Sequence, residues 1–398
     1  MSQPNRLQPV IGYCTNVHAG VNLSEVQENL NRYSLEVKKN VRPNTPMGIG
    51  LWLSHTASRD LLDQNSLHRF ADWLDQHSLV PFTFNGFPYS NFHQPVVKHK
   101  VYEPDWSQPE RFQYTLNLAK IQLQLLLSQT KPVHFATLST LPLGWPSKEG
   151  VTTDYMDQCG RQLIQLCEEL AKIREQSDIR IMVCLEPEPG CVLDTAKDVC
   201  QFFEEQLLTG DADQSERIRN HIGVCHDVCH SSVMFEGQDD ALSQYRQHNI
   251  DIGKFQISSA IEADFERCKD ATQRKALLSQ LNTFQEPRYL HQTSVKNLDG
   301  SVTFHQDLSL AIKDAGSCPT GIWRVHFHVP LFASSLDLVG TTQKDIQSCL
   351  NSIERPADRP LHFELETYAW TVLPEPLRVP LAEGISQEMT WFDKQLEN

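Results

Sequence analysis

The sequence lacks any run of about 18 or more apolar residues, and this excludes a helix that would cross a membrane. Its first residues, "MSQPNRLQPVIGYC", lack the charged and then apolar pattern of a secretory signal. Low-complexity tracts, obvious repeats and a linker that would divide the chain are also missing. We therefore expect a cytoplasmic protein with a single domain over residues 1–398.

The sequence has eleven cysteines but no Cys-x₂-Cys pair, the spacing that zinc fingers and redox-active thiols prefer. Several cysteines stand inside apolar runs such as "IMVCLEP", which is typical of reduced and buried thiols. The stretch "GVCHDVCH" contains Cys225 and Cys229. We expect both to be reduced packing residues that do not bind metal.

Basic residues are scarce relative to acidic ones, with 35 Lys and Arg against 50 Asp and Glu and a formal net charge of −15. Because proteins bind nucleic acid largely by neutralising phosphates with Lys and Arg, this balance disfavours a nucleic-acid partner. The expected partner is a small-molecule metabolite. Apolar residues make up 40% of the chain, which is enough for a sizeable core.

Short apolar runs alternate with helix-like stretches along the whole sequence. This alternation predicts parallel strands joined by helical crossovers, and eight such units close into a (β/α)₈ TIM barrel. The expected barrel strands are residues 10–14, 48–53, 80–84, 133–138, 179–186, 221–227, 251–258 and 361–367.

A ninth strand candidate, "WRVHFHV" (323–329), is one more than the barrel needs. We assign it to a long insertion between the last two barrel strands. That insertion, at about 259–320, also contains an Asp-Gly pair typical of a hairpin turn. A second rim insertion is expected at about 88–108. Together they account for much of the length beyond the roughly 250 residues of a typical barrel.

Polar residues stand where the expected strands end, and barrels of this kind collect function at the carboxyl ends of their strands. Carboxylates and imidazoles that meet at one rim suit a divalent metal, here zinc, manganese or cobalt. For any one residue the alternative is a hydrogen-bonded side chain in a barrel layer; the whole set favours metal. The strand-end residues are Asn85, Glu186, Asp227, Gln256 and Glu366, joined from the insertion by His326 and His328.

Alternation within two runs predicts which side chains share a face. In "HFELET", His362, Glu364 and Glu366 alternate with apolar residues and are expected inside the barrel. In "RVHFHV" the same spacing aligns Arg324 with His326 and His328.

Asp227 and His230 lie at a strand end and in the turn that follows, so both can point to one position above the rim. The alternative for Asp227 is a helix N-cap. We predict a ligand set completed by His328, which lies nearer its strand end than His326. The predicted metal ligands are Glu186, Asp227, His230, His328 and Glu366.

The order of these residues resembles the xylose-isomerase-like barrel superfamily, which contains sugar isomerases, epimerases and endonuclease IV-type nucleases. The resemblance matches the ligands of that pattern to Glu186, Asp227, His230 and Glu366, and its Asp-x-His element to His326 and His328. Gln256 stands where the superfamily has a histidine ligand.

At closer range, "FNGFPY", "LSTLPLGW", "LEPEPGC", "CHDVCHSSVMFE", "WRVHFHVPLF" and "ELETYAWTVLP" resemble the EboE family of metabolite traffic proteins. This resemblance covers nearly the whole chain. It implies a cytoplasmic barrel that acts on or carries a small hydrophobic, prenylated or phosphorylated precursor, together with membrane-associated transport partners.

Three functions therefore compete. The first is a metal-dependent sugar or sugar-phosphate isomerase or epimerase, in which Glu186 and Glu366 shuttle a proton and Lys254 polarises the substrate. The second is a metal-dependent phosphoesterase of the endonuclease IV type, and the third is a metabolite traffic protein, which Gln256 favours. Five further residues are expected to orient the ligands or contact the substrate: Asn85, Gln256, His326, Arg324 and Glu364.

Overall fold

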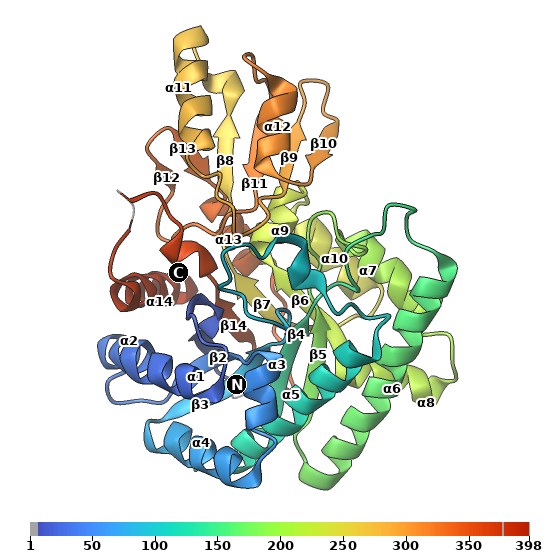
Figure 1. Cartoon of the computed structure of the whole chain (residues 1–398). Helices are drawn as coiled ribbons and strands as arrows, with labels where there is room; N and C mark the ends of the chain where they lie inside the picture. The colour runs from blue at the N-terminus through green and yellow to red at the C-terminus, as the bar shows by residue number, and fades with distance from the viewer. Residues whose placement is uncertain (1–6, 376–377, 398) are drawn as a thin grey trace, which may run out of the picture.

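The computed structural model describes residues 7–375 and 378–397. Eight parallel strands form a nearly closed barrel, the predicted (β/α)₈ architecture (Figure 1). The predicted barrel strands are all present, with ends shifted by a residue or two. They are β1 (Val10–Tyr13), β2 (Met47–Trp52), β3 (Leu79–Asn85), β4 (Phe135–Thr140), β5 (Arg180–Leu185), β6 (Ile222–Asp227), β7 (Ile252–Ile257) and β14 (His362–Leu365).

The hydrogen-bonded strand order is β1-β14-β7-β6-β5-β4-β3-β2. A parallel bridge between Cys14 and Gly50 joins β1 to β2 and brings the two ends of the sheet together. Gly50 is required at this closure, because a Cβ there would lie 1.6 Å from Oε1 of Glu364. The glycine therefore leaves room for a carboxylate in the barrel interior.

Helices surround the barrel in Figure 1. The longest, α6, begins after Thr152, whose hydroxyl accepts the backbone N–H of Tyr155, and ends at Asp178 in a left-handed conformation. No helix in the described part of the chain is long and apolar enough to cross a bilayer. The helices that follow the barrel strands are α1 (Leu23–Asn29), α2 (Leu35–Val41), α3 (His55–Asp60), α4 (Gln64–Gln76), α5 (Pro109–Leu127), α6 (Thr153–Ser177), α7 (Ala196–Phe202), α8 (Ala212–His221), α9 (Val228–Val233), α10 (Gln238–Gln247), α13 (Gln343–Ser352) and α14 (Leu381–Glu397).

A second, antiparallel sheet is inserted between β7 and β14, with strand order β10-β9-β11-β8-β13-β12. It stands beyond one end of the barrel together with two helices (Figure 1). Its strands continue to Thr341, past the expected end of the insertion at about residue 320. The inserted elements are β8 (Ile261–Asp264), α11 (Ala271–Asn282), β9 (Thr293–Lys296), β10 (Val302–His305), α12 (Leu308–Ala315), β11 (Ile322–Val325), β12 (Ser335–Leu336) and β13 (Val339–Thr341).

The expected hairpin is present as β9 and β10, whose turn contains Gly300 at a φ of 86°. The expected strand 323–329 is correct only at its start, because β11 ends at Val325. The chain then turns back to the barrel, where the N–H of Val329 donates to the carbonyl of Ser259. For this reason the predicted alignment of Arg324 with the two histidines is wrong.

Candidate metal centre

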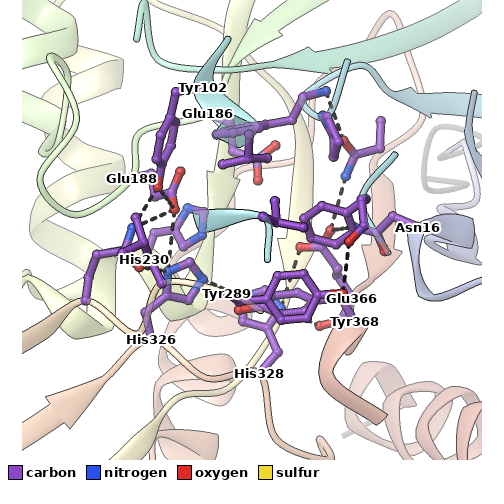
Figure 2. A pocket seen from close by; sticks show the side chains of 18 of the residues that line it. Asn16, Tyr102, Glu186, Glu188, His230, Tyr289, His326, His328, Glu366 and Tyr368 are labelled. Carbon is purple, nitrogen blue, oxygen red and sulfur yellow. Dashed lines mark hydrogen bonds and ion pairs between the residues drawn. The ribbon is translucent and has the colours of Figure 1, made fainter. Parts of the chain in front are cut away.

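Seven buried side chains with metal-ligating atoms gather at the carboxyl ends of the barrel strands. They follow β5 and β14, end or follow β6, and come from the segment after β11, so distant parts of the sequence meet at one rim (Figure 2). The members are Glu186, Glu188, Asp227, His230, His326, His328 and Glu366, each at most 6% exposed.

Three carboxylates form one side of this cluster. Ligand oxygens of Glu186, Asp227 and Glu366 all lie within 4.8 Å of one another. Burial, opposed in part by His230 and reinforced by Asp227, raises the pKa of Glu186 to about 7. Burial and the neighbouring Glu186 and Asp227 raise the pKa of Glu366 to about 8. Without a cation, Glu366 is therefore mostly protonated at neutral pH and Glu186 is about half protonated.

Asp227 has two roles that its two oxygens divide. Its Oδ1 accepts the backbone N–H of His230 at 2.9 Å, which caps α9, and the hydroxyl of Ser258 at 2.6 Å. Its Oδ2 is buried and has no hydrogen-bond partner. Burial alone would raise the pKa of Asp227, but His230 and His328 lower it below its ordinary value. Asp227 can therefore cap α9 through Oδ1 and still offer Oδ2 to a metal ion.

Three histidines form the other side, and each uses Nδ1 for a fixed hydrogen bond. His230 Nδ1 pairs with the carbonyl of Pro187 at 2.8 Å, and His328 Nδ1 pairs with the carbonyl of Glu366 at 2.9 Å. His326 Nδ1 pairs with Oε1 of Gln292 at 2.9 Å. The Nε2 atoms of His326 and His328 consequently face each other at 3.3 Å. Imidazoles that are oriented through Nδ1 and converge through Nε2 are typical of metal ligands.

The donors fit a divalent ion. Glu186 Oε2 and Asp227 Oδ2 are buried without hydrogen-bond partners, which is costly for carboxylates unless a cation coordinates them. Two triads bring their ligand atoms within 4.8 Å and share Asp227: Glu186 with Asp227 and Glu366, and Asp227 with His230 and His328. Together the two triads contain the five predicted ligands, which the fold therefore brings together.

A pocket lies directly over these donors, with an empty volume of about 540 Å³. Its floor contains Glu186, Glu188, Glu366 and the three histidines; most of the other lining side chains are aromatic or aliphatic, and the polar ones are Asn16, Asn85, Lys98 and Gln292. Figure 2 shows the floor side chains from one side of the pocket. A small molecule in this pocket would therefore contact the candidate ligands directly.

Comparison with known proteins concerns the fold. No protein-family model matches the chain, and no curated protein matches it. An L-ribulose 3-epimerase structure matches with a TM-score of 0.50 and 12% identity, over 98% of this chain and 95% of that one. A xylose isomerase-like TIM barrel protein from Mycobacterium smegmatis, in complex with magnesium, matches with a TM-score of 0.50 and 10% identity, over 98% of each chain. The chain has the xylose-isomerase-like barrel fold.

Inside this xylose-isomerase-like barrel, Lys254 and Glu364 form an ion pair next to the candidate metal centre. Both side chains are fully buried, and the Lys254 ammonium also reaches the hydroxyl of Ser139 at 3.3 Å. Burial alone lowers the pKa of Lys254, but Glu364 raises it well above its ordinary value. Neither residue lines the pocket. The placement assigns both to support of the floor rather than to contact with a substrate.

The other predicted residues lie in different surroundings. Asn85 donates from Nδ2 to Oε1 of Glu366 at 3.1 Å. Gln256 lies against Glu366, and its amide lowers the pKa of that carboxyl group. Arg324 lies outside the pocket lining and forms ion pairs with Glu262 and Asp345 at 2.8 and 3.3 Å. Arg324 therefore anchors β11 rather than the centre.

Sequence reasoning missed several residues of the site. Glu188 follows Glu186 by two positions in "LEPEPGC", a spacing that signals a second carboxylate beyond the strand end. Its oxygen accepts the hydroxyl of Tyr102 and the amide of Gln292, each at 2.8 Å. Asn16 donates to Oε1 of Glu366 at 2.5 Å. Gln292 and Tyr102 come from the two rim insertions and carried no periodic signal.

Cys225 and Cys229 have no disulfide partner in the structure. Cys225 packs with Phe135, Met182 and Cys184, away from the pocket. Cys229 packs with Val233 and Ala260, although its Sγ also lies within 4.8 Å of donor atoms of His326 and His328. Burial raises the pKa of both thiols well above the ordinary value, which disfavours the thiolate that would bind metal.

Proposed function

We propose that the protein is a metal-dependent isomerase or epimerase of a small hydroxylated carbonyl compound. One observation carries the proposal: Glu186 and Glu366 border the same pocket and lie beside buried oxygen atoms of Glu186 and Asp227 that have no hydrogen-bond partner and could bind a divalent ion. A carboxylate within reach of the substrate can remove or return a proton, which is the step that an isomerase or epimerase needs. The carbohydrate-epimerase fold of a solved neighbour supports the same reaction class.

The ligands we propose are Glu186, Asp227, His230, His328 and Glu366, with zinc, manganese or cobalt as the ion. When bound, such an ion polarises the oxygens of a hydroxy-carbonyl group and acidifies the adjacent C–H bond. A solved neighbour with the same fold is in complex with magnesium, which supports a divalent ion in this protein.

The protein side chains supply the proton handling. Glu186 and Glu366 approach the pocket from β5 and β14, so one removes a proton from the substrate carbon and the other returns it. Asn16 and Asn85 both donate to Oε1 of Glu366, which fixes the direction of that carboxyl group. Lys254 holds Glu364 and, through its positive charge, lowers the pKa of Glu186. It acts as a positioning residue.

Phosphoester hydrolysis is less well supported, because Lys98, the only Lys or Arg among the described residues of the pocket lining, is engaged by Asp307. Metabolite traffic of the EboE type is the second candidate, and Gln256 favours it. A neutral amide there, in place of a histidine ligand, suits a barrel that binds a metabolite without turning it over. Membrane-associated transport partners and a cytoplasmic location belong to this second proposal.

The test combines metal analysis with isotope exchange. Protein purified without added metal should contain a divalent ion, and it should exchange deuterium from D₂O into the carbon-bound position of a hydroxy ketone. Glu186→Gln and Glu366→Gln should abolish exchange. Glu236→Gln is the matched control, because Glu236 is a mostly buried carboxyl group, also with a pKa of about 7, outside the pocket. Metal binding without exchange of any hydroxy carbonyl would favour the traffic function.

A further inference from the structure

We propose that the substrate is polar at one end only: a hydroxy-carbonyl head on the metal side, joined to a flat, uncharged and apolar body. This inference rests on the proposed function and names its substrate class. It separates the protein from enzymes that bind free sugars or sugar phosphates, whose substrates carry polar groups along their whole length.

The part of the pocket opposite the metal ligands, which we call the roof, is apolar. It is built by the segment between β3 and α5 and by the segment after α11, which are held together where the backbone N–H groups of Val97 and Lys98 both donate to the carbonyl of Arg288. The apolar roof residues are Phe87, Pro88, Phe92, Val97, Val101 and Leu290.

The polar groups of the roof already have partners. The hydroxyl of Tyr102 donates to Glu188 at 2.8 Å, and the hydroxyl of Tyr289 donates to the carbonyl of Phe92 at 3.2 Å. Gln292 uses its amide nitrogen for Glu188 and its oxygen for His326. The O–H and N–H donors of these side chains are already used, so a polyhydroxylated substrate would bury hydroxyl groups here with few donors to pair with, which is unfavourable.

Charge points the same way. The Lys98 ammonium is bound by the carboxylate of Asp307 from the inserted lobe. A phosphate at the roof end would have to compete with Asp307 for Lys98, the one Lys or Arg among the described residues that line the pocket. The roof end therefore suits an uncharged group.

Aromatic rings give the pocket wall its shape. The rings of Tyr289 and Tyr368 meet edge to face with centroids 4.9 Å apart, and Phe92 lies 4.8 Å from Tyr289. Tyr368 in turn contacts the ring of His328 at 4.6 Å. This continuous aromatic wall runs from the roof to the metal ligands, and rings of this kind pack well against a planar apolar group.

The unpartnered polar atoms lie at the opposite end. Glu186 Oε2, Asp227 Oδ2 and Oδ1 of Asn16 are buried and without hydrogen-bond partners. The demand for polar ligand groups is thus confined to the floor, where the metal and the substrate head would satisfy it. A molecule with a polar head and an apolar body matches this division.

The test compares three hydroxy ketones that share the same open-chain head: 2-hydroxyacetophenone, dihydroxyacetone and L-erythrulose. Calorimetric titration into manganese-loaded protein should show 2-hydroxyacetophenone binding at least about tenfold more tightly than either polyol. Equal or tighter binding of dihydroxyacetone or erythrulose would overturn the inference, and so would failure of 2-hydroxyacetophenone to bind.

A matched pair of conservative variants tests the roof. Val101→Thr puts a hydroxyl into the lining, whereas Val96→Thr makes the same change at a 49% exposed position of the same segment outside it. Val101→Thr should weaken 2-hydroxyacetophenone several-fold and leave dihydroxyacetone unchanged or tighter, while Val96→Thr should change neither. An unchanged preference in Val101→Thr would contradict the roof assignment.

Failure of the proposed function would look different. If manganese did not bind, or if no hydroxy ketone exchanged deuterium, the enzyme proposal would fail. The order of the three affinities, measured in metal-free protein as well, would still report whether the roof selects an apolar body.

Discussion

Glu364 lies in β14 and Glu366 follows the end of that strand, two positions on; both are buried, yet their surroundings are opposite. Glu364 has a resident cation, because the Lys254 ammonium lies against its Oε2. Glu366 faces two further carboxyl groups, Glu186 and Asp227. The negative charge of Glu364 is therefore neutralised by Lys254, whereas Glu366 lies beside other carboxyl groups and forms no ion pair with a lysine or arginine among the described residues.

The difference shows how a buried carboxylate reveals its role. A carboxylate paired with a cation from the same chain can stay ionised without an external ion, as Glu364 does through Oε2, although its Oε1 is buried without a hydrogen-bond partner. A carboxylate that meets other carboxylates must hold a proton or obtain a cation from outside. Without a metal, Glu366 takes the first course: burial and the neighbouring Glu186 and Asp227 raise its pKa to about 8, so it holds a proton at neutral pH.

The largest expected effect is a difference in the free energy of unfolding when each of the two glutamates is replaced by glutamine. Glu364→Gln leaves the Lys254 charge buried and unpaired, and we expect a loss of about 3–5 kcal/mol in the free energy of unfolding. Glu366→Gln replaces a carboxyl group that is already mostly protonated at neutral pH with a neutral amide, so the metal-free protein should keep its stability. Urea denaturation of both variants without metal measures the contrast.

The second half of that experiment adds manganese. Wild type should gain stability by mass action, and Glu366→Gln should gain much less because it has lost a ligand. If both variants destabilised the metal-free protein equally, the two layers would be electrostatically alike and the metal centre would lose its main support.

The shared face of Glu364 and Glu366 was predictable, because alternation in "HFELET" places both inside the barrel. The strand ends likewise identified Glu186 and Asp227. The ion pair between Glu364 and Lys254 was not predictable. It depends on the register between β14 and β7, which sets Glu364 opposite Gln256 and so brings Lys254, two positions earlier in β7, within reach. Periodicity shows which face a side chain takes, but not the level at which neighbouring strands bring their residues together.

The pocket roof was also beyond the sequence. Tyr102, Tyr289 and Gln292 belong to irregular segments whose path is set by contacts between the insertions, such as that between Lys98 and Asp307. The alternation in "RVHFHV" misled for a related reason. The pattern continued past Val325, but the chain left the strand there and returned to the barrel.

A smaller expected effect is the pH dependence of the stability of the metal-free protein. Burial and neighbouring carboxylates raise the pKa of Glu186 to about 7 and of Glu366 to about 8. Burial alone lowers the pKa of His230, but Asp227 and Glu188 raise it to about 9. All three groups bind protons more tightly in the folded protein. Their contribution to the stability of the metal-free protein is therefore complete below the ordinary pKa values and is lost as the pH rises through about 7 to 9.

Metal binding has the opposite slope, because it requires the ligands without their protons. The rise in melting temperature that manganese causes should increase from about pH 6 to about pH 8, with affinity growing about tenfold per pH unit for each proton released. Thermal melts with and without manganese at several pH values measure it. A shift that stayed constant or shrank as the pH rose would mean that these three groups are not displaced by the ion.

The smallest expected effect is on metal content when Cys225 and Cys229, two thiols near the candidate metal centre, are replaced. Cys229 is the closer test, since its Sγ lies within 4.8 Å of donor atoms of His326 and His328 while packing against Val233 and Ala260. Burial raises the pKa of this thiol well above its ordinary value, so the metal should compete poorly with its proton. Replacing Cys225 and Cys229 together with Ser should cost about 1–3 kcal/mol of stability for each hydroxyl group that becomes buried among apolar side chains. The metal content per folded protein should stay that of wild type, whereas Glu366→Gln should lower it. Loss of metal from a folded Cys229→Ser variant would mean that the thiol is a ligand. The metal would then lie nearer to Cys229, His326 and His328 than to the three carboxylates.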